Sequence, residues 1–229
     1  MPLSLTSEVP TPHLDGKNEH DVTEVTAHFK FQALPNSCVP TCIRNVLKAL
    51  ADSHSSPAIA LSEARVNQLC RYRLNFGPIM IDIVPNLNKV LTSYGYHAFG
   101  QVGITYDTMV KIIEDKESSY PIIELSHKYL DDRRGAAEEL GIPNPPDHVI
   151  IVLSSDANET IIFDPFDTRS KTMQARPDRI GTGLYLMSTG QITEYWEQAS
   201  TGWAFWISKK AGETTKPTVL DQYAKGEAK

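Results

Sequence analysis

The sequence predicts an α+β domain, because its apolar residues follow a helical period in the first half of the chain and an extended pattern in the second. Up to about residue 116, apolar side chains recur every three or four positions, as on one face of a helix. From Pro121 onward, short apolar runs bounded by turn residues are typical of strands. The 229 residues fit one large domain or two small ones.

Cap and turn residues delimit the expected elements. Residues 1–25 are expected to form a flexible leader, residues 26–209 the folded domain, and residues 210–229 a disordered tail. Pro85 is expected to begin the third helix, and residues 127–147 are expected to form a long polar loop. Helices are expected over 38–52, 63–72, 85–94, 106–116 and 188–199, and strands over 96–102, 121–126, 148–153, 160–164, 185–187 and 203–208.

Composition excludes several classes of function. A net charge of −6 argues against a nucleic-acid-binding surface, and no apolar run approaches the roughly 18 residues of a membrane span. The three cysteines have no metal-site spacing and leave at least one thiol free, which suits a reducing compartment. The N-terminus lacks a signal-peptide pattern, so we expect a cytoplasmic protein without metal or cofactor; the oligomeric state is left open.

Cys38 stands where an irregular segment enters the first expected helix. Ser37 is a good N-cap residue, and Pro40 is tolerated in a first turn. A thiol in this turn faces bare amides and the positive end of the helix dipole, which favours the nucleophilic thiolate. Gln32, six residues upstream, could fold back and donate its side-chain amide to an oxyanion. The alternative is that Cys38, like Cys42 in the same helix, is a packed core residue.

The expected hairpin over 148–164 supplies a second pair of polar residues. With its turn centred near Asp156, Val149 faces Phe163 and His148 faces Asp164, with Cβ atoms roughly 5 Å apart. A carboxylate there would fix the imidazole tautomer and free the other ring nitrogen for Cys38. Thiol hydrolases use this arrangement, in which a nucleophile is paired with a base and an acid orients the base.

These motifs resemble one known family. Gln32, five intervening residues and Cys38, followed later by 147–152 (DHVIIV) and 161–165 (IIFDP), are similar to the bacteriocin-processing, double-glycine-leader cysteine peptidases and their domain-only relatives. The resemblance covers about residues 28–208. It implies a papain-like fold, in which a helical half bearing Cys38 packs against an antiparallel sheet bearing His148 and Asp164.

The resemblance also implies roles and a substrate. Cys38 would be the nucleophile, His148 the base, Asp164 the orienting acid and Gln32 the oxyanion donor of a cysteine peptidase acting on a peptide or protein. Two departures are Val39 in place of the glycine common after the cysteine, and the long 127–147 insert. A transferase or deamidase on the same triad, an inactive peptide-binding module and a regulatory partner protein stay open as alternatives.

Other polar and thiol residues rank lower. His127 is a rival base, since it follows an expected strand. Asp147 and Asp167 are interpreted as solvated loop acids, and Cys70 as a core residue of the second helix.

Overall fold

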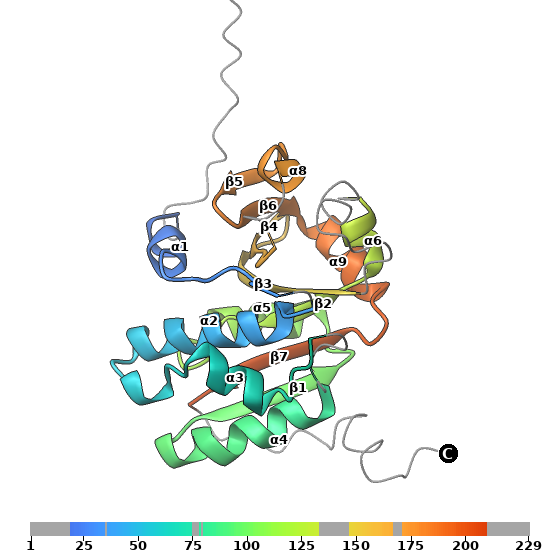
Figure 1. Ribbon diagram of the computed structural model, residues 1–229. Coiled ribbons are helices and arrows are strands. Elements are labelled where there is room, and N and C mark those ends of the chain that lie inside the picture. Colours follow the sequence, from blue (N-terminus) through green and yellow to red (C-terminus); the bar gives the residue numbers. More distant parts are fainter. Residues whose placement is uncertain are drawn as a thin grey trace, which may run out of the picture.

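A seven-stranded antiparallel sheet, in the order β1-β7-β2-β3-β4-β6-β5, runs through the protein and carries helices on both faces (Figure 1). The computed structural model describes residues 19–34, 36–74, 78, 80–132, 147–166 and 171–209. Helices and an antiparallel sheet together confirm the α+β class expected from the sequence.

The strands are β1 His97–Val102, β2 Ile122–Leu125, β3 His148–Ser155, β4 Glu159–Phe163, β5 Arg179–Gly181, β6 Leu184–Ser188 and β7 Trp203–Ser208. The α-helices are α1 Glu19–Thr26, α2 Cys38–Ser53, α3 Glu63–Leu69, α4 Met80–Leu91, α5 Tyr106–Glu114, α6 His127–Asp131, α8 Lys171–Gln174 and α9 Thr189–Glu197. Two short 3₁₀ turns, η1 Pro57–Ile59 and η2 Thr92–Tyr94, follow α2 and α4.

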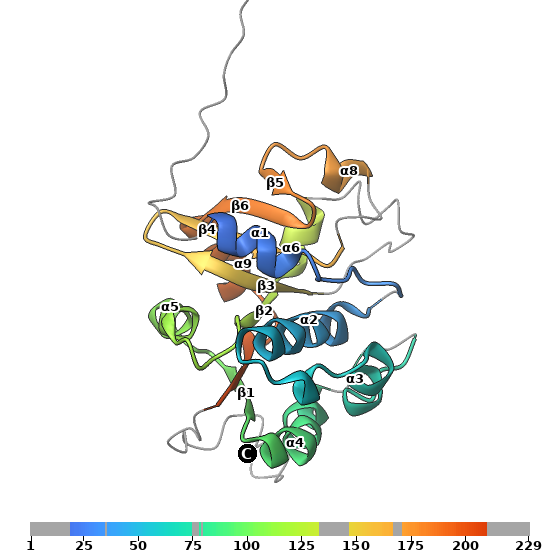
Figure 2. The same ribbon diagram turned by 90° about the vertical axis from the view of Figure 1, so that its left-hand side faces the viewer.

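The sheet separates two hydrophobic cores, and Figure 2 shows α5 on the opposite side of the strands from α2, α3 and α4. The first core joins α2, α3 and α4 to residues such as Val149 and Ile151 of β3. The second joins α5, α6 and α9 to the alternate residues Ile150 and Val152 of the same strand. Because successive side chains of a strand point to opposite faces, a strand segment covered on both sides is apolar on both, as β3 is from Val149 to Leu153.

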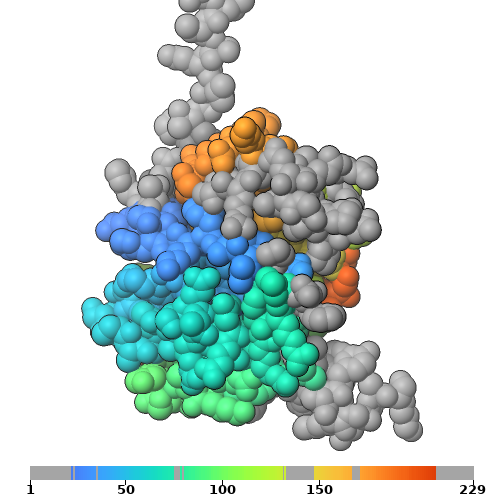
Figure 3. All heavy atoms as spheres, in the orientation of Figure 1, coloured from blue at the N-terminus to red at the C-terminus, as the bar shows by residue number. Residues whose placement is uncertain are grey.

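Helix α2 brings Cys38 to the sheet. Ten of its residues are buried, among them the fully buried Ile43, Val46 and Leu47. Each such side chain stabilises the fold by about 1.5–3 kcal/mol relative to an exposed one, so this helix is firmly anchored. In the space-filling view, the N-terminal helices make up the blue-to-green surface below the orange segment around β5 and α8 (Figure 3).

Local signals located most elements, and the differences have physical causes. Ser62 and Thr105 cap α3 and α5, each accepting a backbone N–H with its side-chain oxygen, and these helices begin where helices were expected, at about residues 63 and 106. Helix α4 begins at Met80 rather than at Pro85, so the proline lies inside it, at the loss of one intrahelical hydrogen bond. Helix α1 begins at Glu19, within the range expected to be flexible, and buries Val22.

Two other segments contain more structure than expected. Helix α6 begins the segment that was expected to be a loop, and α8 and β5 lie in the polar stretch before β6. Most of the expected 127–147 loop, residues 133–146, lies outside the described residues, as do Asp167 and the tail from 210.

The β3–β4 hairpin exists, but its expected register is wrong by two residues. Ile151, not Val149, lies opposite Phe163, and the register shifts again between Val152 and Ser154. The turn is centred beyond Asp156, whose Oδ1 accepts the backbone N–H groups of the next residues, 158 and 159, at 2.7 and 2.8 Å. A displacement of two residues preserves the face to which each side chain points, whereas a displacement of one would have reversed it.

Candidate active site

Cys38 is the first residue of α2 and is half-buried. Ser37 occupies the N-cap position, but contrary to expectation its hydroxyl does not cap the helix. Instead the Oγ donates to the carbonyl of Leu34 at 2.7 Å. The hydroxyl therefore closes the turn that precedes the helix and does not occupy the amides of the first turn. Cys38 thus lies at a helix N-terminus, where the dipole and the amides favour negative charge.

The other two cysteines are core residues, as expected. Cys42 is fully buried, and its thiol donates to the carbonyl of Val149 at 3.6 Å. Burial raises the pKa of Cys42 well above its usual value and that of Cys70 to about 12. Among the three cysteines, only Cys38 combines partial exposure with a helix terminus.

His148 and Asp164 form a buried pair. The Nε2 atom of His148 lies 2.8 Å from Oδ1 of Asp164, and both side chains are at most 4% exposed. The residues are diagonal rather than directly opposed, since the β3–β4 register, continued past the end of β4, would pair His148 with Phe166, whose ring centroid lies 5.7 Å from that of the imidazole. Because Nε2 faces Asp164, Nδ1 is the ring nitrogen left for the Cys38 sulfur, which lies near enough to help raise the pKa of His148.

The charge of His148 is set by a balance of opposing effects. Burial alone would lower the pKa of His148, because a desolvated imidazolium is unfavourable. The Asp164 carboxylate, through its charge and its hydrogen bond, and the Cys38 sulfur outweigh burial and raise the pKa from 6.5 to about 10. His148 is therefore an imidazolium at neutral pH.

Asp164 is fully buried and accepts three hydrogen bonds. Besides His148, the backbone N–H of Phe166 donates to Oδ1 at 2.9 Å, and the hydroxyl of Tyr129 donates to Oδ2 at 2.7 Å. Burial would raise the pKa of Asp164, but the charge of His148 and these hydrogen bonds hold it below its usual value. The carboxylate is thus ionised and has donors on both oxygens.

Gln32 lies in the segment that leads into α2, and it is buried. Its backbone N–H donates to the carbonyl of Pro165, next to Asp164, at 2.8 Å. Its side-chain Nε2 donates to Leu34 at 3.3 Å, while Oε1 is buried without a hydrogen-bond partner in the described part of the chain. The segment does fold back toward the Asp164 loop; an oxyanion role for Gln32 stays a prediction.

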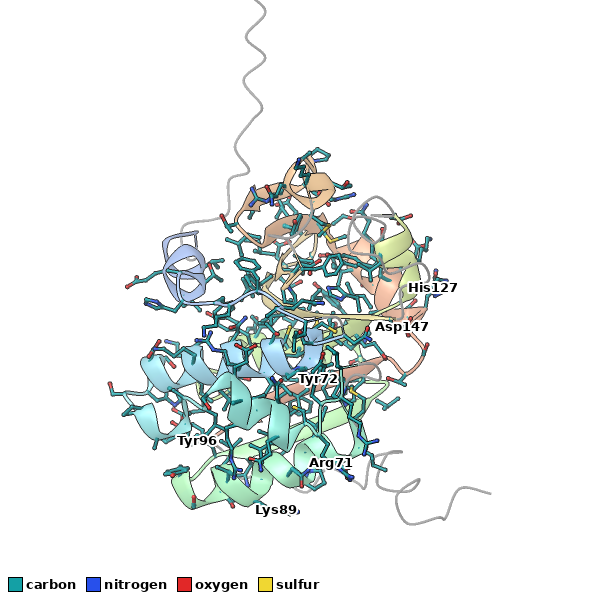
Figure 4. The ribbon with its side chains drawn as sticks, viewed as in Figure 1. Arg71, Tyr72, Lys89, Tyr96, His127 and Asp147 are labelled. Atoms are coloured by element: carbon teal, nitrogen blue, oxygen red, sulfur yellow. The ribbon has the colours of Figure 1, made fainter. Side chains whose placement is uncertain are left out.

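Two candidates of lower rank, His127 and Asp147, lie beside each other at the start of α6. His127 begins α6, and its side chain is 67% exposed. The interpretation of Asp147 as a solvated acid is wrong: its side chain is 11% exposed and accepts the backbone N–H groups of His127 and Ser200 at 2.8 and 2.5 Å. Figure 4 shows His127 and Asp147 together at the end of the molecule where α6 lies.

Two tyrosines near the site were missed by sequence reasoning. Tyr129 contacts both His148 and Asp164, but it lies in a segment that was expected to be a loop. Tyr72 follows α3 and lies near the start of α2 (Figure 4); its pKa is raised first by burial and then by the nearby Cys38 sulfur. Neither has a local sequence signal, because only the packing of α6 and α3 brings them there.

The site lies where the two cores meet. Cys38 packs against the first core, whereas Tyr129 and Phe166, the ring neighbours of His148, belong to the second. A cavity of about 460 Å³ at the other end of α2, lined in part by Ser53, His54 and Asp115, is separate from this site.

The site residues are a thiol, an imidazole and a carboxylate without metal-binding geometry. Among the described residues, no group of three His, Cys, Asp or Glu side chains is placed to hold a metal ion. The described helices include none with the length and apolar character needed to cross a membrane. No family model matches the sequence, and no curated protein matches it.

Proposed function

We propose that this protein is a thiol-dependent hydrolase, a papain-like cysteine peptidase that cleaves peptide or isopeptide amide bonds with Cys38, His148 and Asp164. The observation that carries the proposal is the buried His148–Asp164 pair, which reaches the half-buried Cys38 sulfur at a helix N-terminus. The three residues come from α2, from the start of β3 and from the loop after β4. Of the three side chains, only the nucleophile Cys38 is partly exposed, and a hydrolase needs its nucleophile to be accessible to the substrate.

The reaction needs no group beyond these residues and water. An imidazolium beside Cys38 favours the thiolate, which attacks the amide carbonyl carbon while the carbonyl π electrons move to the oxygen. As the carbonyl re-forms, the C–N bond breaks and His148 gives its proton to the leaving amine. Water then attacks the thioester carbonyl and gives a proton to His148; the C–S bond breaks, releasing the acid and the thiolate.

Gln32 and the helix terminus are suited to the oxyanion. The proposal assigns one hydrogen bond to the Gln32 side-chain amide and one to the backbone N–H of Cys38. The present bond from Gln32 to Leu34 is long, at 3.3 Å, and Oε1 has no described partner, so rotating the amide costs little. Gln32→Ala should lower kcat by about a hundredfold or more, with a smaller effect on KM.

The order Gln32, Cys38, His148, Asp164 supports kinship with the double-glycine-leader cysteine peptidases. We propose a peptide or protein substrate on this basis. All three cysteines are free, and we propose a reducing compartment, such as the cytoplasm, as the place of action.

Active-site labelling tests the proposal. A peptide-derived electrophile should label the wild type and the matched control Cys70→Ala, but not Cys38→Ala, and it should label His148→Ala at least about a hundredfold more slowly. Equal labelling of all four proteins would reject a catalytic Cys38.

Product analysis then identifies the reaction. Digestion of a peptide library with water alone should release free carboxylates. Release only in the presence of added amine would instead identify a transferase, and release of ammonia from glutamine side chains a deamidase.

A further inference from the structure

We propose that Tyr129 is a positioning residue of this site: its hydroxyl fixes the Asp164 carboxylate, and its ring supports the imidazole of His148. The two partners thereby keep one orientation toward Cys38. This inference rests on the proposed function and adds a supporting side chain to the group of Cys38, His148 and Asp164. Tyr129 would not touch the reacting atoms, and it would act only through Asp164 and His148.

Tyr129 contacts both partners at once. Its side chain is fully buried, its Oη donates to Oδ2 of Asp164 at 2.7 Å, and its ring stacks on the imidazole of His148 with centroids 5.8 Å apart and planes 13° apart. The ring limits the tilt of the imidazole, while the hydroxyl limits the rotation of the carboxylate. One rigid side chain therefore constrains the His148–Asp164 hydrogen bond from both ends.

The Tyr129 hydroxyl donates to the carboxylate oxygen of Asp164 that the other donors do not bond. His148 and the backbone N–H of Phe166 both donate to Oδ1 of Asp164, and Tyr129 donates to Oδ2. Without the phenol, the two remaining donors among the described residues would both lie on one oxygen of a fully buried carboxylate. Such a group could turn toward other donors, and a desolvated charge that lacks donors is disfavoured.

Helix α6 is held at its start and along its buried face, as a positioning role requires. A five-residue helix has little stability alone. Asp147 accepts the backbone N–H of its first residue, His127, and the side chains of Tyr129 and Leu130 are buried in the second core. These contacts set the place from which Tyr129 reaches the site.

Several charged or titratable groups surround His148 and Tyr129. His148 faces Cys38 and Asp164 directly. Tyr129 faces Asp164 and the ring of Tyr195, edge to face at 5.6 Å, and the Arg176 guanidinium on the loop after α8 lies near both tyrosines. A pH effect assigned to the Tyr129 hydroxyl must therefore be separated from that of its neighbours.

Two matched substitutions distinguish the effect of the Tyr129 hydroxyl from that of its neighbours. Tyr129→Phe removes the hydroxyl that bonds Asp164 and keeps the ring. Tyr195→Phe removes a hydroxyl from the same aromatic cluster, but that hydroxyl bonds Asp132. The readouts on the full chain are the carboxyl ¹³C titration of Asp164 and the pH profile of Cys38 alkylation by iodoacetamide.

The expected result is specific to one variant. In Tyr129→Phe, the Asp164 titration and the acidic limb of the alkylation profile move to higher pH by about one unit, because a carboxylate loses a donor. Alkylation and peptide hydrolysis at neutral pH fall by about tenfold or more. Tyr195→Phe should leave both titrations unmoved; no shift in Tyr129→Phe, or an equal shift in both variants, overturns the proposal.

A third variant tests the proposal if Tyr129→Phe does not fold. Fluorotyrosine placed at position 129 is a stronger donor of the same shape, and the Asp164 titration should then move to lower pH; an unmoved titration overturns the proposal. The Asp164 readout needs no substrate. If it moves as expected while the wild type hydrolyses no amide, the proposed function fails and the positioning role stands.

Discussion

Replacing Asp164 with asparagine tests the electrostatic basis of the site directly. In the wild type, burial disfavours the imidazolium of His148, and the Asp164 carboxylate is the main group that opposes it. Asparagine has nearly the same shape but no charge. We expect the pKa of His148 to fall from about 10 to below 6.5, since burial then dominates. A shift of this size corresponds to about 5 kcal/mol in the preference for the imidazolium.

The shift is measured by ¹⁵N NMR of the histidine rings, with the His148 signals assigned from His148→Ala. At neutral pH the imidazole becomes neutral in Asp164→Asn, so alkylation of Cys38 should slow by about a hundredfold or more. Asp147→Asn is the matched control, because Asp147 precedes His148 but bonds the backbone of other residues. An imidazolium that persists above about pH 8 in Asp164→Asn, or an equal shift in the control, would refute this account.

Three further outcomes are expected. A thiol reagent should modify Cys38 rapidly in the native protein and the two buried cysteines only on unfolding; three equally fast thiols would contradict the burial. Because folding raises the pKa of His148 from 6.5 to about 10, its contribution to stability is complete below about pH 6.5 and is lost as the pH rises to about 10. The free energy of unfolding from denaturant titrations should fall across that window, and a flat profile would argue against a charged His148. Gly183→Ala should destabilise the fold by roughly 2–4 kcal/mol, because Gly183 has φ +75° and a Cβ there would lie 2.6 Å from the ring of Phe163. Gly190→Ala, where a Cβ meets no atom within 4 Å, is the control, and equal thermal melts of the two variants would contradict the steric reasoning.

Local signals predicted the framework well, because caps, turns and periodicity act over a few residues. Ser62, Thr105 and the period of α2 located helices without knowledge of their neighbours. The same kind of reasoning failed at Pro85, which lies inside α4, and at Ser37, whose hydroxyl closes the preceding turn instead of capping α2. The predicted hairpin register was wrong for a different reason. If the turn centre is displaced by one residue, each residue of one strand pairs with a residue two positions away from the predicted one.

The pairing of His148 with Asp164 was nevertheless predicted, because a strand register that is wrong by two residues keeps both side chains on one face. A diagonal neighbour is still within reach of a long polar side chain. The face on which a residue lies is thus more predictable than its direct partner.

The sequence by itself determined the α+β class, the position of Cys38 at a helix N-terminus, the strand that begins at His148 and the strand that ends just before Asp164, since each depends on short-range periodicity or turn chemistry. Only the tertiary structure decided that helices cover both faces of the sheet, so that α6 brings Tyr129 against the His148–Asp164 pair. Contacts between segments far apart in the chain depend on how whole surfaces pack, and no local pattern records that.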